Sequence, residues 1–238
     1  MSLDVINNNP KMLREWIEQA KVREKKYREE HPDSLIPLFE AELRELGYDF
    51  EISNQTLTFM PKHKKTILPI AIRYYQEAKK LGKDNEQEHF LSFFHFKGFD
   101  DVVPMLLEDF HSTKTKDLTR WFIGSCLYEI RSKSYIPEYL EIISNAAYGS
   151  NRQLLILLMG EWKVEDAIPI LIELLEDEDV RLHAISALGY FKREEFRPYF
   201  ERFENSKHSG WRKYARAALK KLDKQQNSSV SGNGELRL

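Results

Sequence analysis

Four arginines recur along this 238-residue sequence at nearly constant spacing, and their type and placement could do chemistry. Arg120, Arg152, Arg181 and Arg212 are 32, 29 and 31 residues apart. A guanidinium is a rigid fork of donors that fits carboxylates and phosphates, so such a row could grip an anionic partner. It could instead bond acidic residues and carbonyls in neighbouring turns. We favour the second interpretation, because residues that recur at a fixed period usually serve contacts between repeated units.

Other residue types form no catalytic pattern. The seven histidines contain no His-Glu-x-x-His pair, and neither a glycine-rich phosphate loop nor a G-x-S-x-G turn is present. Cys126 lies in an apolar run, which predicts a buried, inert thiol. The acidic pairs Glu165-Asp166 and Glu194-Glu195 fall at expected helix starts, where carboxylates complement the helix dipole. The sequence therefore predicts no catalytic residue, no metal site and no cofactor.

The elements that position the arginines are indicated by an internal repeat. MGEWKVEDAIP at 159–169 returns as LGYFKREEFRP at 188–198. Prolines 69, 104, 137, 169 and 198 each begin a segment with helical apolar spacing, and each arginine begins a second one. The expected caps of the second helices are Asp117, Ser150 or Asn151, Asp179 and Ser209.

Two short helices in about 30 residues cannot bury an apolar face alone, so neighbouring units must stack. We therefore predict an all-α solenoid, an alpha-alpha superhelix of about four to five helix pairs, over 65–222. Residues 1–64 are expected to form an N-terminal helical cap. Its first helix, 9–31, would have Asn9 as its cap, Pro10 at its first position and a Glu24–Arg28 pair.

The remaining segments carry more local predictions. A second helix of the cap would run over SLIPLFEAELRELG and end at Gly47. Alternating apolar residues then predict a hairpin or an extended segment over 48–62, and both stay open. Residues 223–238 are polar and aperiodic, and are expected to be a disordered tail.

The segment DEDVRLHAISALGYFKREEFRPYFERF resembles a HEAT repeat of the short bacterial kind also seen in phycobilin-lyase-type proteins. The match is carried by Asp179-Val180-Arg181, Ala184 and Ala187-Leu188-Gly189, and it extends well over 100–222 and loosely over 65–99. The whole chain is similar to a group of bacterial HEAT-repeat proteins through Leu43-Arg44, Gly47-Tyr48-Asp49 and Trp121-Phe122-Ile123-Gly124. This resemblance implies a fold but no activity.

In a solenoid the second helices line the concave face, so their outward positions are the best binding candidates. Trp121, Tyr128, Lys213 and Arg216 could anchor a partner's aromatic or acidic residues. Alternatively, Trp121 packs against an adjacent unit, and the basic residues cover the polar end of the stack. The full set of predicted groove positions is Trp121, Gly124, Ser125, Tyr128, Gln153, Ile156, Leu157, Gly160, Leu182, Ile185, Ser186, Gly189, Lys213, Arg216, Ala217 and Lys220.

The composition argues against two classes of protein, nucleic-acid binders and membrane-spanning proteins. The formal net charge is −2 with 31% charged residues, so the basic excess typical of a nucleic-acid binder is missing. No apolar run reaches the roughly 20 residues of a membrane span, and the first residues do not resemble a signal peptide. We expect a cytoplasmic, non-catalytic protein-binding scaffold or adaptor that uses the concave face. Its partner would be an unidentified protein, and its oligomeric state stays open.

An enzymatic alternative is a DNA-binding enzyme of the HEAT-like alkylpurine DNA glycosylase type. Enzymes of that type use Trp, Asp and Arg side chains in a basic concave cleft. The candidates that the resemblance implies here are Trp121, Arg120, Arg152 and Asp117. The weak basic balance counts against it, because phosphate contacts dominate DNA affinity. A lyase-type chaperone for a bilin and an immunity protein against a toxin are further possibilities, and neither has a specific sequence mark.

Overall fold

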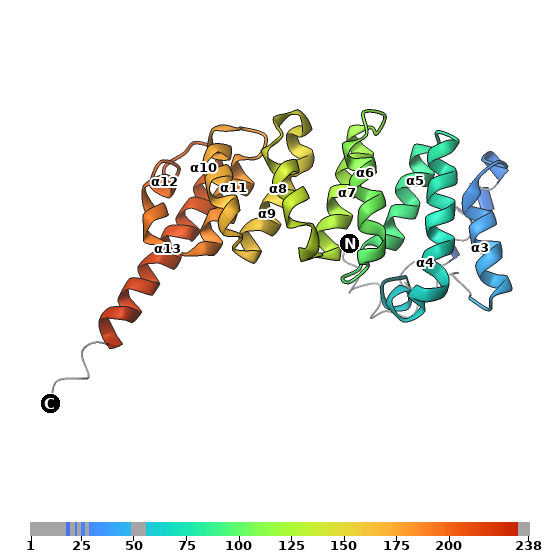
Figure 1. Ribbon diagram of the computed structural model, residues 1–238, viewed down its shortest axis with the longest axis horizontal. Helices are drawn as coiled ribbons and strands as arrows, with labels where there is room; N and C mark the ends of the chain where they lie inside the picture. The colour runs from blue at the N-terminus through green and yellow to red at the C-terminus, as the bar shows by residue number, and fades with distance from the viewer. Residues whose placement is uncertain (1–17, 20–21, 23–24, 27–28, 49–55, 233–238) are drawn as a thin grey trace. The chain divides into compact units, whose positions relative to one another are not determined.

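The computed structural model of the protein describes residues 18–19, 22, 25–26, 29–48 and 56–232. All regular structure among these residues is helical, which confirms the predicted all-α solenoid class. The chain divides into two compact units, residues 1–94 and residues 95–238. Figure 1 shows the helices of both units, and each unit is described by itself below.

Unit 1 is built around the long helix α4, which packs against both α3 and α5. Its core is aromatic: the ring of Phe39 meets the rings of Tyr74, Phe90 and Phe93 edge-on. Such edge-to-face pairs are favourable beyond the apolar area that they bury. The helices are α3 (Leu35–Glu45), α4 (Thr56–Lys80), α5 (Asp84–Leu91) and the short 3-10 turn η2 (Ser92–Phe94).

Helix α3 ends where the sequence predicted. Gly47 has φ +84°, a left-handed conformation that glycine adopts without a steric penalty. The N–H of Tyr48 donates to the carbonyl of Leu43 at 2.9 Å, and the N–H of Gly47 donates to Arg44 at 2.9 Å. These bonds satisfy carbonyls at the helix end. At the start, Ser34 Oγ accepts from the N–H of Ile36 at 3.3 Å.

The segment before the first repeat differs from the prediction. Residues 56–62 belong to helix α4, not to a hairpin or an extended segment, and 49–55 lie outside the described residues. α4 bends at His63, whose φ of −113° and ψ of 16° are not helical. Met60 is buried before the bend and Ile67 after it, and the helical segment that holds Met60 replaces the expected alternation. Pro69 lies inside α4 on its exposed side and begins no helix, because water can satisfy the carbonyl that loses its partner there.

The predicted first helix is described only in part. Residues 18–19, 22, 25–26 and 29–30 are helical, in agreement with the prediction for 9–31. Lys25 pairs with Glu29 and Lys26 with Glu30, both at i,i+4 spacing. The expected cap Asn9, Pro10 and the Glu24–Arg28 pair lie outside the described residues.

Unit 2 is a stack of helix pairs. Each first helix packs against the second helix of its own pair, and consecutive second helices pack against one another. Figure 1 shows these pairs in chain order from green to red. The first helices are α6 (Val103–His111), α8 (Ile136–Ser144), α10 (Ile168–Glu173) and α12 (Arg197–Glu201). The second helices are α7 (Asp117–Ile130), α9 (Gln153–Trp162), α11 (Arg181–Phe191) and α13 (Ser209–Gly232).

The repeated phrase is the connection between units, as predicted. Lys163 and Lys192 are the left-handed residues that end α9 and α11. A 3-10 turn follows each of them, η6 (Glu165–Ala167) or η8 (Glu194–Phe196). The next first helix then begins, with its proline in the first turn, where the missing N–H costs nothing. Four of the five recurring prolines occupy this position: Pro104, Pro137, Pro169 and Pro198.

Two predictions about helix ends need correction. The N-caps of α7, α9 and α11 are Lys116, Arg152 and Val180, and none of them accepts a capping hydrogen bond through its side chain. At the other end, α13 continues through residues 223–232 of the expected disordered tail 223–238, and 233–238 lie outside the described residues. A helix already nucleated in the stack extends at low cost over a sequence such as KKLDKQQ.

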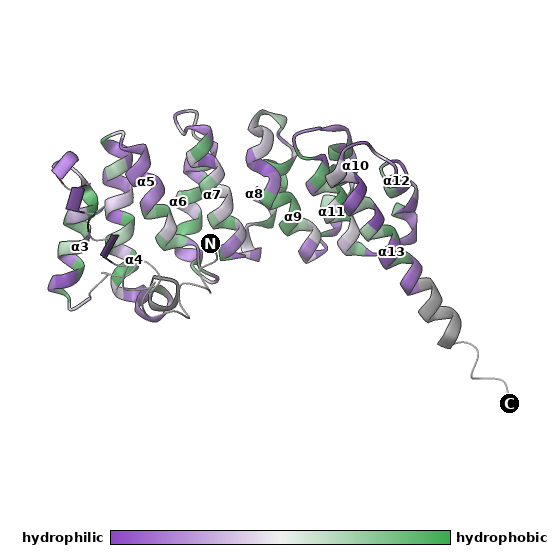
Figure 2. Cartoon of the chain, turned by 180° about the vertical axis from the view of Figure 1, so that it is seen from behind, coloured by the Kyte–Doolittle hydropathy of each residue, from purple (hydrophilic) through white to green (hydrophobic). Residues whose placement is uncertain are grey.

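Close approach of second helices depends on small residues. A Cβ on Gly160 of α9 would lie 2.4 Å from Cα and 2.5 Å from the carbonyl oxygen of Ala187 in α11. In the next pair, a Cβ on Gly189 would lie 3.3 Å from the Cβ of Ala218 in α13. Figure 2 shows the apolar stretch along α9 that lies in this layer.

We predict that Gly160→Ala lowers the free energy of unfolding by about 1–3 kcal/mol, because overlap with backbone forces the helices apart. The gain in helix propensity of about 1 kcal/mol does not offset this overlap. The matched control is Gly189→Ala, whose neighbour is a single methyl group. Urea unfolding of both variants should show Gly160→Ala to be the less stable. Equal stabilities would contradict the assigned contact.

Candidate functional site

The recurring arginines bind the ends of the first helices. Arg120 donates through Nε to the carbonyl of Phe110 at 2.9 Å, and through Nη2 to the carbonyls of Ser112 at 2.9 Å and Thr115 at 3.0 Å. Its Nη1 bonds Asp117 at 2.8 Å. The guanidinium therefore satisfies carbonyls left open where α6 ends, and it ties the second helix to the first.

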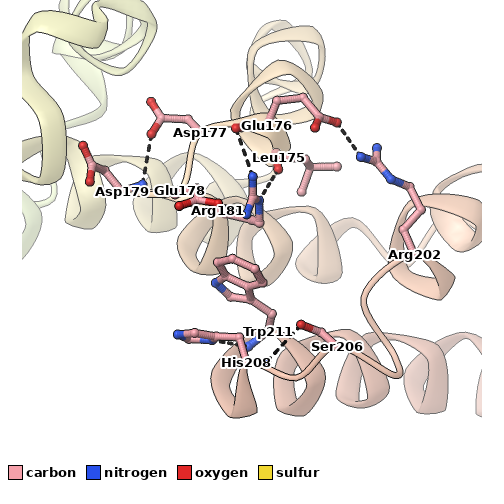
Figure 3. Close-up of polar contacts among 10 residues, drawn as sticks. All are labelled: Leu175, Glu176, Asp177, Glu178, Asp179, Arg181, Arg202, Ser206, His208 and Trp211. Atoms are coloured by element: carbon pink, nitrogen blue, oxygen red, sulfur yellow. Dashed lines mark hydrogen bonds and ion pairs between the residues drawn. The ribbon is translucent and has the colours of Figure 1, made fainter.

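Arg181 repeats this arrangement in the third pair (Figure 3). Its Nε donates to the carbonyl of Leu175 at 2.5 Å and its Nη2 donates to that of Glu176 at 3.0 Å. The guanidinium carbon lies 4.4 Å from the ring centroid of Trp211, a cation–π contact with the next pair. Trp211 in turn stacks on His208, with 4.4 Å between ring centroids. Arg181 thus connects its own helix pair to the next one.

Arg152 is the most buried member of the row, with 1% of its surface exposed. It donates to the carbonyls of Gly149 and Ile143, each at 3.0 Å, and pairs with Asp177. In the last pair, Arg212 donates to the carbonyl of Ser206 at 2.6 Å. Arg120, Arg152 and Arg181 donate through all three of their nitrogens within the protein, and Arg212 donates through Nη1, which agrees with the favoured structural interpretation of the row.

We predict that Arg152→Ala lowers the free energy of unfolding by about 3 kcal/mol, because it leaves buried carbonyls and the Asp177 carboxylate without their partner. Arg152→Lys keeps the charge but cannot reach three acceptors with one ammonium group, so it should fall between Ala and the wild type. Chemical unfolding measures both. Wild-type stability of Arg152→Ala would show that these contacts contribute nothing.

The outward side of the second helices carries apolar and aromatic side chains that are exposed or half-buried. Leu118 is 60% exposed and Trp121 is 39% exposed, although both are large apolar side chains. Trp121 touches Phe122, with 5.5 Å between ring centroids. We call this surface the second-helix face and define it by Leu118, Trp121 and Phe122 of α7, Leu154 and Leu157 of α9, Leu182, His183 and Tyr190 of α11, and Lys213, Tyr214 and Lys221 of α13.

The predicted groove positions were partly misplaced around the helices. The positions that are buried in the structure are Gly124, Ile156, Gly160, Ile185 and Gly189. Gly160 and Gly189 lie against Ala187 and Ala218 of the next second helix, whereas Gly124 lies against Asn151 and Phe110. Sequence reasoning missed Leu118, Tyr190 and Lys221 of this face. It also missed Phe122, Leu154, His183 and Tyr214, each of which lies two residues after an arginine of the row. That constant offset is a signal by which they could have been found.

Two of the predicted anchors make polar contacts within the stack. Tyr128 donates to Glu161 at 2.7 Å, and Glu161 also pairs with Arg131 at 2.7 Å. Burial, followed by the neighbouring Glu161 carboxylate, raises the pKa of Tyr128 to about 12. Arg216 donates to the carbonyl of Glu204 at 2.8 Å. Lys213 is exposed, and its ammonium group lies 5.9 Å from the ring of Tyr214.

One histidine lies beside the cysteine in unit 2: Cys126 Sγ is 3.6 Å from both ring nitrogens of His95, and His95 Nε2 is 3.2 Å from Ser125 Oγ. Cys126 is buried, and its burial raises the pKa of its thiol well above the usual range. Asp117 is bonded to Arg120 and also accepts from Asn151 Nδ2 at 3.4 Å, while Arg152 is buried. Three of the four residues expected of a DNA glycosylase, Asp117, Arg120 and Arg152, are thus engaged in helix contacts, and the fourth, Trp121, is exposed. Over the part of the chain that the structure describes, no group of three or more His, Cys, Asp or Glu side chains could hold a metal ion.

His183 lies half-buried on the second-helix face, and its Nδ1 has no hydrogen-bond partner among the described residues. Burial lowers the pKa of His183, and it also lowers that of His89 in unit 1, where Glu86 partly opposes it. The unfolded chain takes up protons near pH 6.5, while the folded imidazoles remain neutral to lower pH. Below pH 7 the unfolded state therefore gains stability.

We expect the free energy of unfolding to fall as the pH is lowered from 7 through 6.5 toward the depressed folded pKa values. Urea unfolding at several pH values measures this slope. The double variant His89→Gln/His183→Gln should have a shallower slope over the same window. An identical slope would assign the pH dependence to other groups.

The fold and this face define a class: an α-helical repeat scaffold whose second helices present a long outward surface. Residues 136–220, which include α8 to α12 and the first half of α13, match the family model described as HEAT repeats. This part of the chain consists of HEAT repeats, as the resemblance of its sequence implied. Neither the curated proteins nor the solved structures include a match to the chain. Among the described residues, no helix has the length and apolar character needed to cross a bilayer.

Proposed function

We propose that the protein is a non-catalytic scaffold or adaptor that binds another protein through the second-helix face, the concave face expected of a HEAT solenoid. HEAT repeats commonly mediate protein interactions, and this supports the general class. The observation that carries the proposal is the exposure of Leu118 and Trp121 beside Phe122. Neighbouring exposed apolar and aromatic side chains are typical anchors of protein interfaces.

The predicted arginines contribute to this surface only indirectly. Arg120, Arg152 and Arg181 are bound to carbonyls, and Arg152 is buried, so they hold the second helices in place and leave few donors for a ligand. Trp121 and Lys213 remain the predicted residues most available to a partner, and Tyr214 joins them. Tyr128 contributes a half-buried ring beside Glu161.

The proposal is tested by affinity capture from cells that express the protein, followed by measurement of the captured partner's Kd. Leu118→Ala/Trp121→Ala should weaken binding at least tenfold, because central aromatic anchors contribute about 2 kcal/mol or more. The matched control is Leu38→Ala/Leu81→Ala, which removes two apolar side chains of similar exposure from unit 1. Recovery of nucleic acid alone, or equal loss in both double variants, would reject the proposal.

A further inference from the structure

Basic side chains occupy a strained backbone position at the end of the second helices. Arg131, Lys163 and Lys192 have φ values of 59°, 53° and 54°, and they are the positive-φ residues other than glycine in the described chain. A left-handed conformation is unfavourable for any residue with a Cβ, so glycine is usual at such helix ends. Gly47 fills the corresponding position after α3. The basic side chains are therefore kept at a conformational cost.

Contacts within the protein explain the basic side chain at only one of these three positive-φ positions. Arg131 pairs with Glu161 and lies over the ring of Trp162 at 5.8 Å, so its guanidinium holds neighbouring units together. Lys163 and Lys192 have no ion pair within the described residues, and both are exposed. Their retention at a strained position therefore points to something outside this part of the chain.

These two lysines meet in one surface pocket of about 420 Å³, which we call the lysine pocket. It is lined by Lys163, Phe191, Lys192, Lys221, Lys224 and Gln225. Phe191 is 7% exposed and supplies an apolar wall. Three successive second helices contribute to the pocket, because Lys163 follows α9, Lys192 follows α11 and Lys221 belongs to α13.

Several nearby acids are engaged by arginines. Glu165 pairs with Arg193, and both Glu194 and Asp223 pair with Arg197. Glu165, Glu194 and Asp223 lie close in sequence to Lys163, Lys192 and Lys221, but their negative charge is balanced by the arginines. The positive charge of the three lysines is therefore only weakly compensated. A carboxylate that enters the lysine pocket would meet several ammonium groups at once.

The lysine pocket also adjoins the second-helix face. Lys221 belongs to both, and its ammonium group lies 5.2 Å from the ring of Tyr190 on that face. Glu129 is exposed on α7 beside the face, and it would repel a phosphate backbone running along it. A peptide with apolar residues and an acidic group near one end fits both regions better than a nucleic acid does.

We propose that the lysine pocket receives aspartate or glutamate carboxylates of an acidic segment in the partner protein, next to the apolar residues of that segment. This inference rests on the proposed function and specifies the chemistry of the partner. The acidic segment lies with its carboxylates between Lys163 and Lys192, and its neighbouring apolar side chain contacts Phe191 or Tyr190.

The test is fluorescence anisotropy at low ionic strength with labelled decaglutamate, decalysine and a ten-nucleotide thymidine strand. Decaglutamate should bind, its affinity should fall with added salt, and decalysine should not bind. Lys163→Gly/Lys192→Gly should weaken decaglutamate binding about tenfold. The melting temperature of this double variant should be unchanged or raised, because glycine fits the positive φ of both positions. Lys221→Gln, which leaves the strained positions intact, should also weaken binding.

The matched control is Lys114→Gly/Lys207→Gly, which removes two exposed lysines elsewhere and should bind decaglutamate like the wild type. Equal binding by the pocket and control variants, or no preference for decaglutamate over decalysine, would overturn the inference. Tighter binding of the thymidine strand through the same lysines would assign the pocket to nucleic acid. If the captured partner is lost only in Leu118→Ala/Trp121→Ala, the proposed function stands and the lysine pocket has no part in it.

Discussion

The contact on which the rest of unit 2 depends is the bond from a guanidinium to backbone carbonyls at the end of the preceding first helix or in the turn that follows it. Arg120 bonds Phe110 at the end of α6, whereas Arg181 bonds Leu175 and Glu176 in the 3-10 turn after α10. An arginine at the start of the second helix satisfies several of these carbonyls together, and in Arg152 and Arg181 it also reaches the next unit. One side chain thereby fixes the angle within a pair and the contact between pairs.

The structure distinguishes residues that hold the stack together from residues that lie on its outer surface, a distinction that the sequence alone left open. The periodic positions hold the stack together: the arginines bind carbonyls, and Gly160 allows the backbone of α11 to approach. The residues that vary from unit to unit, such as Trp121, Gln153, Leu182 and Lys213, lie outward at equivalent positions. A regular framework with a variable outer surface suits recognition of a partner better than catalysis, because no reacting group has to be placed precisely.

Much of the fold could be predicted because the repeat length and the residues that begin or end helices are local signals in the sequence. The proline starts, the Gly47 stop and the short repeats all follow from residues close together in sequence. The rotation of each second helix could not be predicted in the same way, since it depends on which residues the adjacent helix covers. Ile185 and Gly189 were therefore placed on the groove and are buried. The hairpin or extended segment predicted for 48–62 is wrong over 56–62, because an alternation of a few apolar residues is too short to distinguish a strand from a helix.

Contacts that link each second helix only to its immediate neighbours also decide how the array comes apart. Among the described residues, α9 packs against two other second helices, α7 and α11, whereas α13 packs against one, α11. Amide hydrogens near the carboxyl end should therefore exchange with solvent faster than those of α9, and loosening should spread inward pair by pair.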